Sequence, residues 1–381
     1  MNNLELLFKN NITKEGKKIK IGKGCYCFKI TDSTLNIDCI FEVLKFINNI
    51  LHNTPYNLPI CLVFIRIKGS VKLPLILLEC IVYYIFSVYN KQINIFIKAK
   101  TNVYTNYLKI SPLLSLNHFD KHTKEKFIKK FCIDISMYHY RRKIIAKDAI
   151  ETDELSKLYD DVYHFLMNNN TRENVADNIA EVVVELIGNA FEHGNSDCLL
   201  DIDFEEGVYN KKNDKQYYAI NICVLNFCEK LFYQDIKSKL AKMNTKDDQH
   251  PRYMALKKAY EYHKKQFNEI YTEEDFFTVA AYQHRITGRK EDLSTMGGTG
   301  LTKLIKNIQL QSVVSNCFMI SGNKILWFDK KLLEYDNDGW LGFNSTKNFF
   351  NDIPVTSQFL KKKFYMPGTA YNLNFIIEKE Y

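Results

Sequence analysis

Residues 1–115 alternate short apolar runs with segments whose apolar residues recur at helical spacing. The pattern predicts strands at 20–30, 60–67 and 93–99 and helices at 37–53 and 73–88. Because strands that are apolar throughout are typical of parallel sheets, and parallel strands need crossover connections, this order indicates a βαβ arrangement. We therefore expect a small α/β domain in this part of the chain.

The pattern differs in the rest of the chain. Residues 116–170 are irregular apart from a clear helical pattern at 152–169, so we expect connecting helices and a strand there. Residues 171–381 begin with a helix at about 172–193 and end with two or three strands, with a charged, helix-rich stretch between them. Strands gathered mostly at the end, with helices on one face, predict an α+β sandwich with a mixed sheet.

The helix at 172–193 carries an apolar stripe and a separate polar stripe. The polar stripe consists of Asn178, Glu181, Glu185, Asn189 and His193. Glu185 and Asn189 are one helical turn apart, so their side chains are neighbours. A carboxylate can accept a proton from water, and an amide oxygen can ligate Mg²⁺. Taken alone, however, such a stripe is more often the solvated edge of an amphipathic helix.

A glycine-rich turn, GGTGL, stands at the start of the predicted helix LTKLIKNIQ. Glycines permit close approach of the backbone to a ligand, and a helix N-terminus presents free N–H groups that bind phosphate. The turn is not a Walker A loop, since no GK[ST] follows and no strand directly precedes it. In isolation, a helix cap and turn explain such a sequence in most proteins.

Four segments follow one another in a characteristic order: EVVVELIGNAFEHG, VLNFCEKL, GGTGL and GTAYNLNF. This order resembles the GHKL ATPase superfamily, which includes gyrase, heat-shock chaperones, histidine kinases and mismatch-repair ATPases. The first segment is most similar to the N-box of the anti-sigma-factor serine kinases. The resemblance covers about residues 170–378 and implies a Bergerat-fold ATPase domain over 171–381, with a lid insert at about 230–296.

The resemblance also implies roles for individual residues and the cofactors ATP and Mg²⁺. Glu185 corresponds to the base that activates water or a substrate hydroxyl, Asn189 to the Mg²⁺ ligand, and His193 to a residue at the phosphate end of the site. Thr369 corresponds to a residue that hydrogen-bonds near the adenine. The loop that closes over the phosphates corresponds to Gly297, Gly298, Thr299, Gly300 and Leu301.

The segment VLNFCEKL departs from the family's first glycine box, which reads DxGxG. Asn226 stands where the adenine-binding Asp is expected, and Cys228 replaces a glycine. An asparagine can still accept the adenine hydrogen bond through its carbonyl oxygen. The lost glycine changes how closely the backbone approaches the base, so the adenine preference is open at this point.

The lid insert is longer than a minimal lid and ends in a basic stretch. Arg285, Arg289 and Lys290 lie in this stretch. They either reach phosphates or a partner, or they belong to a solvated loop.

The motif order leaves two kinds of function open. No upstream histidine lies in the two-helix hairpin that a sensor kinase needs, and no transducer domain follows the last predicted strand. The first hypothesis is a Mg-ATP-dependent ATPase or Ser/Thr kinase of the anti-sigma type that acts as a regulatory switch, behind an N-terminal domain of STAS-like pattern. The alternative is a non-hydrolysing, nucleotide-gated interaction module of a bacterial stress or phage-defence system. A purely structural α/β protein would require the motif order to be accidental.

Composition narrows the partners. A net charge of +8 is low for a nucleic-acid-binding chain, and the ten cysteines form no paired CxxC set for zinc. The apolar run at 73–88 is too short for a membrane span and contains Glu79. We therefore expect a cytoplasmic protein with reduced thiols that binds a protein partner and no membrane, and the resemblance allows for a homodimer.

Overall fold

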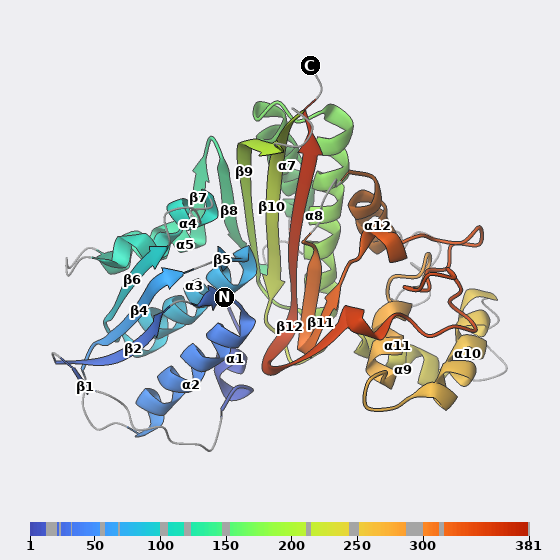
Figure 1. Ribbon diagram of the computed structural model, residues 1–381, viewed down its shortest axis with the longest axis horizontal. Helices are drawn as coiled ribbons and strands as arrows, with labels where there is room; N and C mark the ends of the chain where they lie inside the picture. Colours follow the sequence, from blue (N-terminus) through green and yellow to red (C-terminus); the bar gives the residue numbers. More distant parts are fainter. Residues whose placement is uncertain are drawn as a thin grey trace.

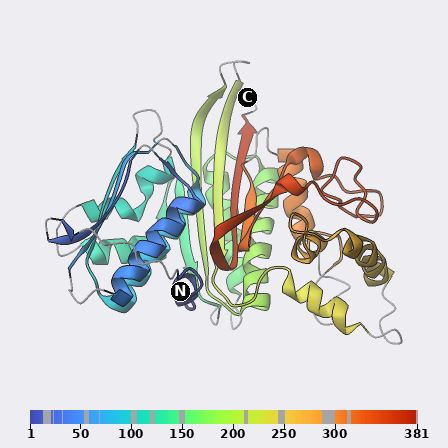
Figure 2. The same ribbon diagram turned by 60° about the horizontal axis from the view of Figure 1, so that its bottom comes forward.

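The computed structural model has a mixed α+β fold with two main sheets (Figure 1). It describes residues 1–12, 21–22, 24–31, 33–53, 58–67, 69–99, 106–117, 123–146, 153–210, 215–243, 251–286, 300–311 and 316–379. Figures 1 and 2 show three parts side by side: an N-terminal α/β domain, a tall central sheet with its helices, and a helical lid region.

The N-terminal domain contains a four-stranded sheet in the order β1-β2-β4-β6. The central strands are parallel, and β1 pairs antiparallel with β2. The bounds are β1 (Ile21–Gly22), β2 (Cys25–Thr31), β4 (Ile60–Ile67) and β6 (Ile93–Ala99), with helices α2 (Ile37–Asn53) and α3 (Lys72–Tyr84) between them. The predicted βαβ arrangement is therefore confirmed. Two short strands, β3 (Thr34–Leu35) and β5 (Gly69–Ser70), form a separate parallel pair.

The helix α3 is the most apolar of this domain, and a π turn, η1 (Ile85–Tyr89), extends it. By length and composition the stretch Lys72–Tyr89 could cross a membrane, but 72% of it is buried inside the protein. This burial is what a core helix requires. The remaining short elements here are α1 (Glu5–Lys9), α4 (Asn106–Ile110), η2 (Pro112–Asn117) and α5 (Thr123–Cys132).

The central sheet has six strands in the order β11-β12-β10-β9-β8-β7. Their bounds are β7 (Ile133–Ser136), β8 (His139–Ile144), β9 (Cys198–Asn210), β10 (Lys215–Asn226), β11 (Phe318–Trp327) and β12 (Phe359–Glu378). All pairings among these described strands are antiparallel, so the expected mixed sheet is wrong. Strands β7 and β8, and likewise β9 and β10, follow each other in the sequence and pair as neighbours, which makes them antiparallel. Strand β12 also pairs antiparallel with β10 and with β11.

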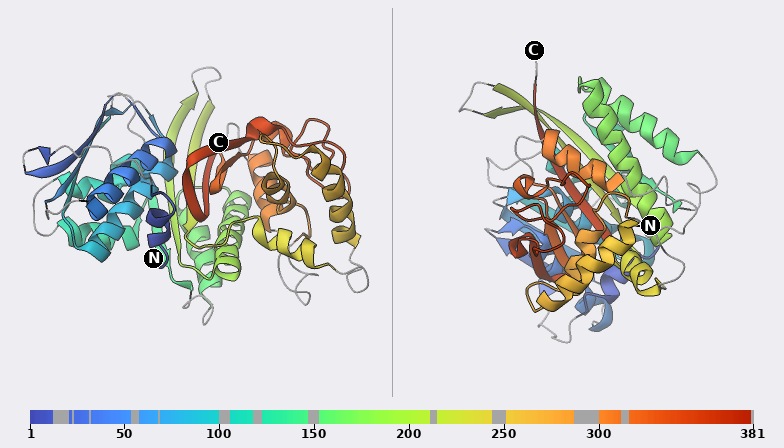
Figure 3. Two further views of the ribbon diagram at one scale, coloured as in Figure 1. Left: turned by 90° about the horizontal axis from the view of Figure 1, so that it is seen from below. Right: turned by 90° about the vertical axis from the view of Figure 1, so that its right-hand side faces the viewer.

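Two further expectations change in detail. The segment 133–144, expected as part of a connection, forms the hairpin β7–β8 and extends the central sheet. The two strand patterns expected after 312 form one strand, β11. Helices α7 (Glu154–Asn168), α8 (Glu173–Gly194) and α12 (Gly300–Gln311) cover one face of the sheet (Figure 3).

The lid region is built from two separate stretches of chain. The first contains α9 (Gln234–Lys242), α10 (Pro251–His263), η3 (Lys264–Gln266) and α11 (Glu273–Ala280), and the second is the irregular stretch 328–358 with η5 (Lys330–Leu332) and η6 (Thr356–Gln358). The Arg252 guanidinium lies 3.9 Å from the centre of the Trp340 ring. His263 hydrogen-bonds with the Tyr271 hydroxyl and with the Phe349 carbonyl. These buried contacts make the two stretches one packing unit.

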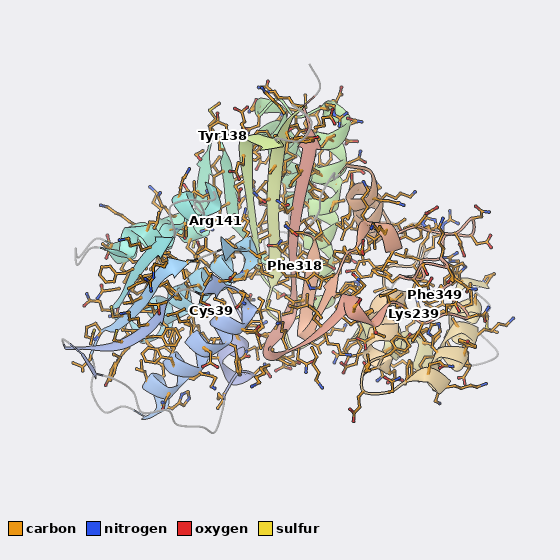
Figure 4. All side chains as sticks on the ribbon, in the orientation of Figure 1. Cys39, Tyr138, Arg141, Lys239, Phe318 and Phe349 are labelled. Atoms are coloured by element: carbon orange, nitrogen blue, oxygen red, sulfur yellow. The ribbon has the colours of Figure 1, made fainter. Side chains whose placement is uncertain are left out.

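The N-terminal domain covers the other face of the central sheet through a buried ion cluster. Lys72 Nζ of α3 lies 2.6 Å from an Asp201 oxygen and 2.5 Å from an Asp203 oxygen, both on β9. Arg141 of β8 pairs with Asp201 and, at 2.7 Å, with Glu79 of α3. All five side chains are almost fully buried. Figure 4 labels Arg141 between the two parts.

The charges in this cluster stabilise one another. Burial alone would lower the pKa of Lys72, but Asp201 and Asp203 raise it above its ordinary value. Burial alone would also lower the pKa of His139, whose ring nitrogens lie 3.0 Å from Asp201 and 3.3 Å from Asp134. The two carboxylates nevertheless raise the pKa of His139 above 6.5. Opposite charges thus outweigh desolvation at both positions.

We expect Lys72→Met to lower the free energy of unfolding by about 3–5 kcal/mol, because it removes the cation that the two buried carboxylates Asp201 and Asp203 share. Lys362→Met is the matched control, since Lys362 pairs at 2.9 Å with the exposed Asp38. That change should cost about 1 kcal/mol or less. Urea unfolding of the whole chain measures both free energies. Equal losses would contradict the larger cost that we assign to removing a buried cation.

We expect the stabilisation from His139 to depend on pH with a definite sign. A pKa that is raised on folding gives stability that is fully present below about pH 6.5 and is lost as the pH rises through the folded-state pKa. The difference in unfolding free energy between wild type and His139→Gln should therefore shrink as the pH rises. A difference that stays constant or grows with pH, in unfolding curves taken from pH 5.5 to 9, would show that His139 is neutral in the fold.

Candidate functional site

A cavity of about 900 Å³, measured out to its mouth, lies between α8, the ends of β10 and β12, and the lid region. Its polar lining residues are Glu185, Asn189, His193, Asn226, Cys228, Lys230, Asp235, Thr369 and Tyr371. Its apolar lining includes Leu186, Val224, Leu231, Phe232, Ile236, Ile286 and Leu301.

Helix α8 positions the first group of polar residues. Its apolar stripe packs in the core against the sheet, so Val182, Val183 and Leu186 are buried. The polar stripe divides into two parts. Glu181 pairs at 2.6 Å with Lys303 on the exposed side of α12, whereas Glu185, one turn later, lines the cavity. The stripe is thus only partly a solvated edge.

Strand pairing positions the second group. Asn226 is the last residue of β10, and its register partner on β12 is Thr369. The Asn226 amide nitrogen donates to the Ser196 hydroxyl at 2.8 Å. Because Ser196 already accepts a hydrogen bond from this nitrogen, the side-chain amide oxygen of Asn226 is the acceptor that we expect a ligand to use.

Two glycines permit this close arrangement. Gly368 has φ +88°, and a Cβ there would lie 2.6 Å from the backbone carbonyl oxygen of Asn226. A Cβ on Gly194 would lie 2.9 Å from both the Asn226 amide nitrogen and the Ser196 hydroxyl. The end of α8 and the ends of both strands therefore meet without room for a side chain.

Cys228 occupies the position of the expected glycine. Its thiol donates to the Lys230 carbonyl at 3.1 Å, and burial raises its pKa. The thiol is therefore neutral at physiological pH, and it forms a small apolar part of the wall beside Asn226.

His193 forms an ion pair with the lid. Its Nδ1 lies 2.6 Å from Asp235 of α9, and Asp235 also pairs with Lys230. Burial alone would raise the pKa of Asp235, but His193 and Lys230 lower it. His193 also directly precedes Gly194, which contacts Asn226. His193 therefore lies near Asn226, and its expected place at the phosphate end stays a prediction.

The glycine-rich loop is described only in part. Gly300 begins α12 and Leu301 lines the cavity, whereas Gly297, Gly298 and Thr299 lie outside the described residues. Arg289 and Lys290 lie outside them as well.

The part of the lid that leads into this loop is basic. Burial lowers the pKa of His284, and the neighbouring charges of Arg252, Arg285 and Lys306 lower it further. Ile286, two residues after His284, lines the cavity. Arg285 directly precedes this lining residue, and positive charge near the cavity would stabilise an anionic ligand group.

Sequence reasoning missed several lining residues. Tyr371 lies two residues after Thr369 on the same strand, so strand alternation was a usable signal. Lys230 and Phe232 belong to the connection between β10 and the lid, and Asp235 lies in the first turn of α9; no local pattern marks them as lining residues. Among the described residues, no group of three or more His, Cys, Asp or Glu side chains can hold a metal ion.

We expect Gly368→Ala to be much more harmful than Gly207→Ala. Both glycines have positive φ, but a Cβ on Gly207 meets nothing within 4 Å. Gly207→Ala should therefore cost about 1–2 kcal/mol from its backbone angle alone, and Gly368→Ala about 1–3 kcal/mol more. Urea unfolding measures both, and equal losses would mean that the contact with Asn226 relaxes freely.

No family model matches the chain, and no curated protein or solved structure matches it either. Its function must therefore be inferred from the cavity and the residues that line it. The GHKL resemblance remains a prediction from motif order.

Proposed function

We propose that the chain binds Mg-ATP in this cavity and acts as a GHKL-type regulatory switch that hydrolyses ATP or phosphorylates a Ser/Thr hydroxyl of a protein partner. One observation carries the proposal. The described residues chosen from four separate motifs, namely Glu185 and Asn189, Asn226, Leu301 and Thr369, all line one cavity.

Base recognition would involve Asn226 and Thr369. The side-chain amide oxygen of Asn226 is an acceptor for an exocyclic amino group, which adenine has at its six-position and guanine lacks there. The Ser196 hydroxyl fixes the amide in this orientation. The substitution of Asp by Asn therefore retains the acceptor that adenine needs.

The chemical step would use α8. Glu185 would accept the proton of water or of a hydroxyl as its oxygen bonds to the terminal phosphorus, while the bond from that phosphorus to the bridging oxygen breaks and ADP leaves. Asn189 would offer one amide oxygen to Mg²⁺, which usually takes its remaining ligands from phosphates and water. The bound ion would neutralise phosphate charge. The positive charge of Arg285, which directly precedes the lining residue Ile286, would add to the attraction for phosphates.

The finer fold and setting belong to the same proposal. A central sheet with α8 and α12 on one face, and a lid inserted between β10 and β11, agrees with a Bergerat-type arrangement. The parallel N-terminal sheet agrees with a STAS-like domain. We propose a cytoplasmic protein that binds a protein partner, with a homodimer as one form of assembly.

A second candidate is a nucleotide-gated interaction module without turnover. The observation that favours it is the altered base-binding segment, in which Cys228 fills the place of a glycine. Binding would then stabilise one position of the lid without hydrolysis.

We expect Glu185→Gln to lower ATP turnover by about 10²–10⁴-fold, because it removes the general base. The affinity for Mg-ATP should stay within about threefold, since the amide has the same shape. The measurement is steady-state turnover together with calorimetric binding of a non-hydrolysable ATP analogue.

Glu181→Gln is the matched control, one turn earlier on α8 and outside the cavity lining, and it should leave both quantities unchanged. Asn189→Ala should weaken binding only when Mg²⁺ is present. Binding without turnover in wild type would favour the interaction module. Absence of adenine-nucleotide binding would refute both candidates.

A further inference from the structure

The N-terminal segment 2–11, which contains α1, lies at the junction between the N-terminal domain and the central sheet (Figures 1 and 3). Three of its asparagines each contact a different segment of chain near the Asn226 end of the cavity: the turn after α8, the residue after β10, and β12. The Asn2 backbone N–H donates to the Asp197 carboxylate at 3.0 Å, and the Asp197 backbone N–H donates to the Asn2 side chain at 3.0 Å. The Asn3 amide donates to the Phe227 carbonyl at 3.3 Å.

The third contact is the strongest geometrically. The Asn11 amide nitrogen donates to the Tyr365 carbonyl at 2.8 Å, and the Tyr365 backbone N–H donates to the Asn11 amide oxygen at 2.8 Å. Asn11 is 2% exposed, and its amide nitrogen also donates to the Leu7 carbonyl of α1. This paired bond fixes the position of β12 relative to α1.

Each contacted segment adjoins residues that line the cavity. Asp197 follows Ser196, which holds the Asn226 amide. Phe227 lies between Asn226 and Cys228. Tyr365 lies three residues before Gly368, whose backbone abuts the Asn226 carbonyl. A shift of the segment would therefore move all three parts of the wall.

The other side of the segment belongs to the N-terminal domain. Leu4, Leu7 and Phe8 are buried in the core that this domain, with α2 and α3, shares with the facing side of the central sheet. The Phe8 ring stacks on Tyr84 of α3 at 4.5 Å between ring centres. The Asn48 amide of α2 donates to the Phe8 carbonyl at 3.1 Å. The segment is thus anchored in one domain and bonded to the cavity of the other.

We propose that segment 2–11 couples the position of the N-terminal domain to the base-binding end of the cavity. The proposal rests on the proposed function for its ligand, and it names Asn3 and Asn11 as positioning residues. When the N-terminal domain is in the position seen here, the three contacted segments hold Asn226 and Thr369 in the geometry that binds the base. A partner that displaces the domain weakens nucleotide binding, and by linkage bound nucleotide holds the domain in place.

Glycine at position 368 makes this coupling stiff. The backbones at 226 and 368 are in contact, with no side chain between them to absorb a movement. Packed backbones of this kind transmit small displacements instead of damping them. A change at Tyr365 therefore reaches Asn226 directly.

The test uses Asn11→Ala in the whole chain, with Asn10→Ala as the matched control. Asn10 is exposed, and within the described part of the chain its amide donates to the Leu6 carbonyl of the same helix at 2.9 Å. Hydrogen–deuterium exchange without nucleotide should become several-fold faster at 195–198, 226–228 and 365–370 in Asn11→Ala, and stay unchanged in Asn10→Ala. Affinity for a non-hydrolysable ATP analogue should fall at least about fivefold in Asn11→Ala only.

Asn3→Gly is the second variant, because glycine retains the φ of +60° found at Asn3 while removing the bond to Phe227. It should accelerate exchange at 226–228 even if Asn11→Ala does not fold. Exchange that increases uniformly over the chain, or unchanged exchange in these loops, would overturn the coupling. If wild type binds no adenine nucleotide, the proposed function fails, and the exchange data still decide the coupling by themselves.

Discussion

The close meeting of β10 and β12 at Asn226 and Thr369 is the constraint on which the candidate site depends. It requires a glycine at 368 with positive φ, and a glycine at 194 where α8 ends against the same point. These backbones meet with no side chain between them, and Glu185, Asn189 and His193 of α8 line the cavity beside them. The cavity is therefore a consequence of backbone packing, to which the lid adds the remaining wall.

A second constraint acts on the opposite face of the same sheet. Three acidic and two basic side chains, Glu79, Asp201, Asp203, Lys72 and Arg141, are buried together where the N-terminal domain covers the sheet. Buried ion clusters of this kind contribute little net stability but penalise any arrangement that separates the partners. The cluster therefore specifies how the domain sits, and the segment 2–11 then connects that seating to the cavity.

The sequence predicted much of this fold for physical reasons that can be named. The N-terminal strands and helices were found because their apolar residues repeat at clear periods, and α8 was found because its apolar and polar stripes separate. The hairpin β7–β8 was missed because its turn, at Met137 and Tyr138, contains neither glycine nor proline. The antiparallel order of the central sheet was missed because strand direction depends on long connections.

The lining residues of the candidate site also fall into those that the sequence predicted and those that it did not. Glu185, Asn189, Asn226 and Thr369 were found from motif order, and all line the cavity. Asp235 and Lys230 were not found, because their role depends on a contact between α8 and the lid that no local pattern records. The partners of Lys72 lie far away in the sequence, so the ion cluster was beyond reach as well.

The most direct test of the central claim is a crystal structure of the chain with Mg²⁺ and a non-hydrolysable ATP analogue. The account predicts the adenine amino group within hydrogen-bond distance of the Asn226 carbonyl oxygen, the ring beside Thr369, and the phosphates beside Asn189. An unoccupied cavity at saturating analogue, or a nucleotide bound elsewhere on the chain, would contradict it.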